Sequence, residues 1–308
     1  MGVIEIQGLL LTIATAAMPL LLASVGELVA ERSGVLNLGV EGMMAVGAVT
    51  GFIAGYATGY PVLGVIAAIL AGMAMSALFG VVTLIFVANQ VASGLALTLF
   101  GLGLSALIGD HFVSIPGLDI ERIHIPGLTD IPLIGPVLFG QDPLFYIAVA
   151  LTAAVGWFLF RTRAGLIVRA VGDNHVSAHS LGYNVIRVRF LAVLFGGACA
   201  GLAGGYLSII YSPQWIPNMT AGRGWIALAL VVFGTWLPLR VAIGAVLFGA
   251  ISILQLNAQG YGVALPPQFL NSLPYLTTVA VLVIISRNRT LLRVNTPACL
   301  GRAFVPDR

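Results

Sequence analysis

Long apolar runs alternate with short polar intervals along the whole chain. An apolar helix of about 20 residues spans the roughly 30 Å hydrocarbon core of a bilayer. We identify candidate helical runs at residues 8–30, 45–59, 62–88, 95–109, 143–160, 190–211, 225–236, 241–256 and 273–285. Inside a bilayer, helices satisfy every backbone polar group within one segment. The pattern therefore predicts an all-α fold, a polytopic transmembrane helical bundle of eight to ten spans.

The polar intervals differ in charge, and the difference predicts the topology. Residues 110–142 carry five acids, one arginine and several prolines, whereas residues 161–189 carry five arginines and one acid. Five further arginines lie in residues 287–308. Because cytoplasmic loops of membrane proteins are rich in arginine and lysine, both basic intervals should be cytoplasmic and the acidic interval external. If the first run is a single span, the N-terminus lies outside.

The chain is expected to be one transmembrane domain over residues 1–308. Its N-terminal helices occupy residues 8–109 and precede the external loop 110–142. Its C-terminal helices occupy residues 143–286 and enclose the basic loop 161–189. The tail 287–308 is then cytoplasmic.

The basic loop contains a short helix with recognisable ends. Asp173 stands at the expected N-cap, about two helical turns follow, and Gly182 supplies the left-handed C-terminal position. A connector between two membrane helices needs only a few residues. The helix either docks another protein or belongs to a solvated loop; the docking interpretation uses Asp173, Asn174, His175, Val176, Ser177, Ala178, His179, Ser180, Leu181 and Gly182.

Polar residues also interrupt the apolar pattern at membrane depth. Residues 27–44 mix acids and Asn37 with three glycines, which favours a broken or re-entrant segment over a continuous span. Glu41 is there either a structural acid bonded to backbone amides or a cavity residue. Residues 89–94, which begin with Asn89 and Gln90, form either a tight cytoplasmic turn or a second unwound stretch.

A matching interruption at residues 212–224 lies in the second half. One broken segment in each half is the expected trace of an internally repeated transporter with its pathway between the halves. The repeat is a hypothesis, since residue-level similarity between the halves is not evident. The candidate pathway residues are Asn37, Glu41, Asn89 and Gln90.

Glycines recur at every fourth position in one run of each half. This spacing lets helix backbones approach closely in lipid. It predicts close helix packing at Gly47, Gly51, Gly55, Gly197, Gly201 and Gly205.

Composition narrows the class of protein further. Of 308 residues, 59% are hydrophobic and 8% are charged, far below the roughly 25% charged residues of soluble domains. The net charge of +3 comes with arginines grouped by topology, so no nucleic-acid partner is expected. Two distant cysteines and the separated His111 and His124 predict neither a disulfide nor a metal site.

Enzyme chemistry is not expected of this chain. Walker, G-x-S-x-G and H-E-x-x-H motifs are absent from the sequence. If the chain pumps a solute, its energy must come from a separate ATPase, which the docking interpretation of the basic loop would accommodate.

Four stretches carry a resemblance to a known family: residues 31–48, 89–109, 169–208 and 221–250. Together they resemble permeases of nucleoside and simple-sugar ABC importers, within the group that includes branched-chain amino-acid permeases. The shorter permease of basic-membrane-protein type nucleoside systems is the most similar. The family usually has a Pro-Glu-Ala-Ala type run in its coupling helix, where this chain has His175-Val176-Ser177-Ala178. That departure puts an acid-mediated contact with the ATPase in doubt.

The resemblance implies the permease subunit of an ATP-driven importer that translocates a nucleoside, a related purine or a simple sugar by alternating access. Implied partners are a second homologous permease, an ABC ATP-binding subunit that binds ATP and Mg²⁺, and an extracytoplasmic solute-binding protein. No cofactor is expected in this chain. The expected location is the bacterial inner membrane, with many spans and a cytoplasmic C-terminus. The alternative is an ion-coupled secondary transporter that works alone.

Overall fold

The computed structural model describes residues 3–118, 120, 122–129, 131, 134–260, 266–286 and 295–306. Helices dominate this part of the chain. They are α1 (Val3–Arg32), α2 (Val40–Thr58), α3 (Pro61–Gly80), η1 (Val81–Ile85), α4 (Gln90–Gly109), η2 (Asp110–Phe112), α5 (Ile134–Phe139), α6 (Pro143–Arg161), α7 (Arg163–Asp173), α8 (His175–Ser180), α9 (Val185–Tyr206), η3 (Leu207–Tyr211), α10 (Arg223–Phe233), α11 (Pro238–Gly260) and α12 (Pro267–Ser286).

The polytopic helical bundle predicted from the sequence is confirmed. Within the described residues, seven helices are long and apolar enough to cross a membrane: α1, α2, α3 with η1, α4 with η2, α6, α9 with η3, and α11. The expected eight to ten spans exceed this number, partly because the run 225–236 forms the 11-residue α10. At 1.5 Å per residue, α10 is about 16 Å long and crosses only half of a bilayer.

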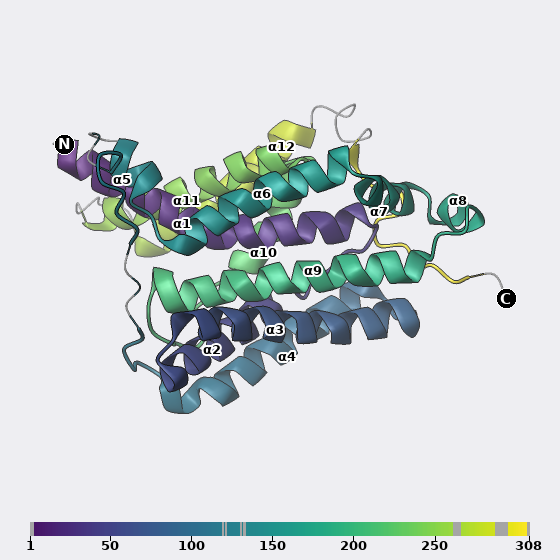
Figure 1. The fold of residues 1–308 in the computed structure, drawn as a ribbon, viewed down its shortest axis with the longest axis horizontal. Coiled ribbons are helices and arrows are strands. Elements are labelled where there is room, and N and C mark those ends of the chain that lie inside the picture. Colours follow the sequence, from purple (N-terminus) through teal and green to yellow (C-terminus); the bar gives the residue numbers. More distant parts are fainter. Residues whose placement is uncertain are drawn as a thin grey trace.

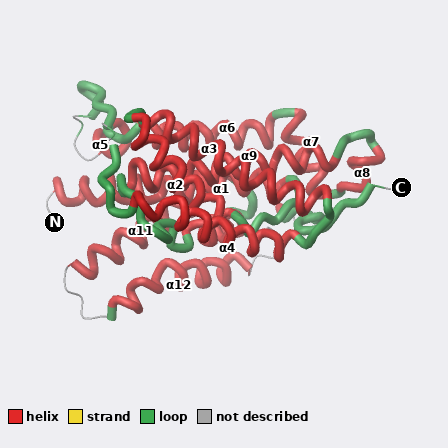
Figure 2. The backbone as a smooth tube through the Cα atoms, turned by 90° about the horizontal axis from the view of Figure 1, so that it is seen from below, coloured by secondary structure: helices red, strands yellow, loops and turns green. Residues whose placement is uncertain are grey.

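The long helices run side by side, and the two ends of the bundle differ (Figure 1). The N-terminus and α5 lie at one end, whereas α7, α8 and the C-terminus lie at the other (Figures 1 and 2). The acidic loop and the basic loop therefore occupy opposite ends. Asp119, Glu121 and Asp130 of the acidic loop and residues 287–294 of the tail fall outside the described residues.

The centre of the bundle is formed by α1, α2 and α9. Residues 16–30 of α1 are buried, and so are most residues of α2. Because α1 is surrounded by other helices rather than by lipid, it can carry the buried acids Glu27 and Glu31. Ionisable groups at this depth have to face protein or water.

Most of the regularly spaced glycines lie where helix backbones touch. A side chain at Gly47 would meet the backbone of Gly201 at 2.5 Å, and one at Gly197 would meet Gly72 on α3. Gly51 and Gly205 both face Ala68 of α3, whereas Gly55 has only contacts near 4 Å. The glycine series packs α2, α3 and α9 within this chain, rather than against a partner.

Candidate functional site

The predicted short helix exists as α8, with both ends fixed by hydrogen bonds. The Asn174 side chain accepts a hydrogen bond from Ser177 N at 3.0 Å, so Asn174 is the N-cap. The expectation that Asp173 caps this helix is wrong, because Asp173 is the last residue of α7. At the other end Gly182 has φ +88°, and its N–H donates to the His179 carbonyl at 2.8 Å. Only glycine adopts such a φ without strain.

One face of α8 is attached to the bundle and the other faces outward. Ala178 is buried against Val171 of α7 and Val185 of α9. Phe304 of the tail packs edge-on against the rings of His175 and His179. On the outer side Val176 is 58% and Leu181 is 78% exposed. These two apolar side chains lie beyond the spanning helices and are free to contact another protein.

Arg189 connects α8 to the rest of the bundle. Its side chain is 1% exposed, and the described residues give it no acidic partner. It donates from Nε to the Ser33 carbonyl at 3.1 Å and from Nη1 to the Arg302 carbonyl at 2.9 Å, and Nη2 lies 3.0 Å from His175 Nδ1. A single guanidinium thus joins three parts of the chain: residues 33–39 between α1 and α2, which we call the first break, the C-terminal tail and α8.

The contact with Arg189 fixes the protonation of His175. Arginine has only donors, so Nδ1 of His175 must be the acceptor and its ring neutral. Burial lowers the pKa of His175, and the positive charges of Arg189 and Arg302 lower it further. The neutral imidazole is therefore the form that this arrangement holds at neutral pH.

The two interrupted segments meet deep in the bundle through Glu41. One carboxylate oxygen accepts from Gly222 N at 2.8 Å, and the other accepts from Gly224 N at 2.6 Å. These amides lie at the start of α10, where a helix has unpaired N–H groups and a partial positive charge. Glu41, in the first turn of α2, therefore caps a helix that lies about 180 residues later in the chain.

The other candidate pathway residues surround the first break. Asn37 is buried; its N–H donates to Glu27 Oε1 at 3.1 Å, and its side-chain oxygen accepts from Gly39 N at 2.9 Å. Gln90 is also buried and accepts from Leu36 N at 2.9 Å. Asn37, Glu41 and Gln90 thus cluster around residues 33–42.

Asn89 lies apart from this cluster. It is exposed, and its side chain caps α4 by accepting from Ala92 N at 3.0 Å. The structure thus gives Asn89 a helix-capping contact at the end of the bundle that carries α7 and α8.

A comparison with protein families decides the class. Residues 9–286 match the family described as the permease component of branched-chain amino acid transport systems. The chain belongs to this permease family. It is the permease subunit of an ABC importer, and its transmembrane bundle is the part of such a system that solute crosses.

Individual relatives of this permease match over most of their length. A Haloferax volcanii protein named as a candidate glucose ABC transporter permease, TsgC13, is 41% identical, with 96% of this chain and 97% of the relative covered. The nucleoside ABC transporter permease NupC of Lactococcus lactis is 32% identical over 86% of this chain and 88% of its own. The guanosine ABC transporter permease NupQ of Bacillus subtilis is 34% identical over 75% of this chain and 76% of its own. No solved structure matches the permease.

Two important residues of the permease were not identified from the sequence. The sequence pattern puts Arg189 at the end of the basic loop, whereas α9 begins at Val185 and therefore includes Arg189. The apolar pattern of residues 185–193, with Arg189 four positions after buried Val185, was the available indication. Phe304 had no indication, because its contacts depend on how the tail folds back.

Proposed function

We propose that this permease imports a nucleoside or a simple sugar by alternating access, driven by a separate ATP-binding subunit that docks on α8. ATP and Mg²⁺ bind to that subunit. A second homologous permease completes the pathway, and an extracytoplasmic solute-binding protein delivers the solute. The C-terminus, which packs beside α8, lies in the cytoplasm of a bacterial cell in this proposal.

The observation that carries the proposal is the continuous set of contacts from α8 into the bundle. A force on α8 reaches Ser33 through Arg189, and Ser33 begins the break that leads to Glu41. Glu41 holds the N-terminus of α10. Movement of α8 would therefore displace both broken segments together, as a gate in the pathway requires.

The class of solute follows from the named relatives. Two are named for nucleosides or guanosine, and the one with the highest quoted identity is named for glucose. These solutes share a polyhydroxylated ring. We therefore propose that the solute pathway passes beside the buried polar cluster of Asn37, Glu41 and Gln90.

The test is Ala178→Pro in the assembled transporter. Ala178 N donates to the Asn174 carbonyl at 3.0 Å, and proline would remove this bond and clash with that carbonyl. The cost is about 3 kcal/mol or more in a helix too short to absorb it. We expect ATPase binding and solute-stimulated ATP hydrolysis to fail, while a reporter fused to the C-terminus still reads cytoplasmic.

The matched control is Ala178→Gly, which lowers helix propensity by only about 1 kcal/mol. It should keep most of the uptake. Normal assembly and transport by Ala178→Pro would show that α8 is not the coupling helix. A reporter signal from outside the cell would show that the proposed topology is inverted.

A further inference from the structure

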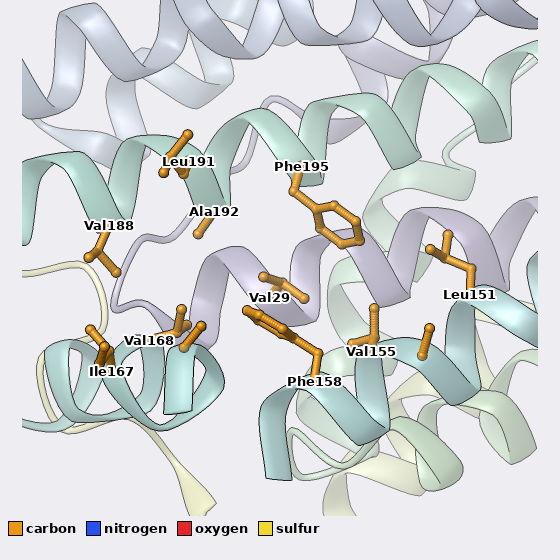
Figure 3. A pocket seen from close by; sticks show the side chains of 12 residues that line it. Val29, Leu151, Val155, Phe158, Ile167, Val168, Val188, Leu191, Ala192 and Phe195 are labelled. Carbon is orange, nitrogen blue, oxygen red and sulfur yellow. The ribbon is translucent and has the colours of Figure 1, made fainter. Parts of the chain in front are cut away.

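An apolar groove opens on the side of the bundle between α6 and α9, and Glu41 is not among its lining residues. Its volume is about 430 Å³. The floor is Val29 of α1, and the walls include Phe158 of α6 and Phe195 of α9 (Figure 3). All twelve lining residues are alanine, valine, leucine, isoleucine or phenylalanine. An uncharged, almost purely hydrocarbon lining offers a polar solute no hydrogen bonds.

The groove lies along the spanning helices α6 and α9 and reaches the end of the bundle that carries α7. On α6 the lining extends from Leu151 to Phe158, and on α9 from Val188 to Phe195. Seven residue steps of a helix cover about 10 Å. The groove is therefore an elongated channel parallel to the helix axes, and Ile167 of α7 lines it near this end.

Three exposed arginines lie at that end, one on each helix that walls the groove. Arg161 follows the lining residue Phe158 by three positions, and Arg163 and Arg187 precede Ile167 and Leu191 by four. Residues three or four apart share a helix face. Within the described residues, the side chains of these three arginines make no hydrogen bond and have no acidic partner.

We propose that the groove binds one acyl chain of an anionic phospholipid from the cytoplasmic leaflet, with its phosphate held by Arg161, Arg163 and Arg187. The leaflet follows from the orientation proposed above, whereas the site itself does not depend on the solute. Arginine donors match phosphate oxygens in geometry and charge. A basic pocket between membrane helices at the cytoplasmic side suits an anionic headgroup.

A second copy of this chain fits the groove less well. A two-fold contact would place the same arginines of both copies against one another, and like charges repel. A phospholipid instead supplies negative charge at the mouth and an apolar chain along the groove. It would also link the bilayer to α7, which is joined to α8 through Asn174.

The experiment uses the assembled transporter in nanodiscs that contain equal amounts of phosphatidylglycerol and phosphatidylcholine. Lipids that stay bound are identified by native mass spectrometry after release. We expect the transporter to retain phosphatidylglycerol selectively. Replacing all three arginines by glutamine should weaken its binding about 100-fold at low salt, since each surface arginine contributes about fivefold. High salt should weaken binding to the native protein as well.

The groove itself is tested with Ala154→Trp, which places a large ring among the lining residues. Its matched control is Ala153→Trp, an exposed neighbour on α6 that does not line the groove. Only Ala154→Trp should displace the lipid. Arg240→Gln on α11 is the control for charge and should leave retention unchanged.

Three results would overturn the proposal. Equal retention of the two lipids would remove the charge selectivity, and retention unaffected by Ala154→Trp would remove the groove. Efficient crosslinking from Ala154→Cys to the partner permease, with no lipid retained, would show that a protein covers the groove.

Discussion

The two broken segments of the bundle are fixed in different ways. Residues 33–39, between α1 and α2, are almost completely buried and are fixed from the end that carries α8. Arg189 binds the Ser33 carbonyl, and the tail residue Gly301 donates to the Gly34 carbonyl at 3.1 Å. Residues 212–222, before α10, include several exposed positions and are tied instead to residues 113–117.

The contacts between the second break and residues 113–117 are backbone hydrogen bonds. Ser114 N donates to the Trp215 carbonyl at 3.2 Å, and Gly117 N donates to the Pro213 carbonyl at 2.8 Å. Each break thus responds to one end of the molecule, and Glu41 is the point where they join. Coupling between the two sides of a transporter needs such a junction between two elements that can each adopt different arrangements.

Arg189→Met should have the largest effect, because it separates the first break from α8. Methionine fills the space but leaves two carbonyls and His175 Nδ1 without a donor. Losing hydrogen bonds from a buried charged group should cost at least about 3 kcal/mol. The unfolding temperature in nanodiscs and the solute-stimulated ATPase activity should both fall.

The control for Arg189 is Arg302→Gln. The Arg302 carbonyl accepts from Arg189, so a change of its exposed side chain keeps that bond. If Arg189→Met couples ATP hydrolysis to uptake as well as this control does, the first break does not depend on α8.

Glu41→Gln tests the junction between the breaks. One carboxylate oxygen becomes an NH₂ group that faces a backbone N–H, so one bond is lost and the other no longer involves a charged acceptor. We expect a loss of about 1.5–3 kcal/mol in the free energy of unfolding. Asp110→Asn, at an exposed carboxylate, should change stability little when measured by the same thermal unfolding. Equal effects of the two substitutions would contradict a junction at Glu41.

Replacing a glycine in each break sharpens the comparison between them. Gly34 and Gly222 have φ of +90° and +82°, so alanine is strained at both, by about 1–3 kcal/mol. At Gly34 the new methyl group would also meet Arg189 Nη2 at 2.8 Å, and the Gly172 Cα and the Cys299 carbonyl at 3.3 Å. At Gly222 its close neighbour is the Tyr275 hydroxyl, which can move. Gly34→Ala should therefore lower the unfolding temperature more, and the reverse order would refute the difference in packing.

Acid should weaken the first break slightly through His175. Because its pKa is lowered in the folded protein, the unfolded chain binds a proton first as the pH falls below about 6.5. Stability is then lost with falling pH until the folded form also titrates. Solvent screening keeps the loss in the free energy of unfolding at about 0.2–1 kcal/mol. Unfolding curves of His175→Asn should lack this component, and an unchanged pH dependence would exclude His175 as its source.

Local patterns in the sequence predicted the local structure of this permease well. The apolar runs predicted the bundle, and the predicted cap at Asp173 with Gly182 at the other end located α8 to within one residue, since the N-cap is Asn174. The glycine spacing identified helix contacts because small residues are needed wherever backbones touch. Each of these features depends on residues close together in the chain.

Long-range polar contacts could not be predicted in the same way. Arg189 binds carbonyls 156 and 113 positions away, and backbone carbonyls carry no mark of their role in the sequence. Glu41 was expected to have one of two roles, and only the position of α10 shows which amides it binds. The run 225–236 was counted among the possible spans, but its helix α10 has 11 residues and is about 16 Å long, which is half of a bilayer.

The helix cap at Glu41 also affects how the permease is made. Its two amide partners lie 181 and 183 residues further along the chain. At about 5–20 residues per second, a ribosome needs roughly 10–40 s to synthesise the intervening segment. By the end of that time six long helices (α1, α2, α3, α4, α6 and α9) are complete, while Glu41 still lacks its partners at the start of α10. The N-terminal half therefore cannot reach its final structure during synthesis, and assembly of the core finishes only after α10 has entered the membrane.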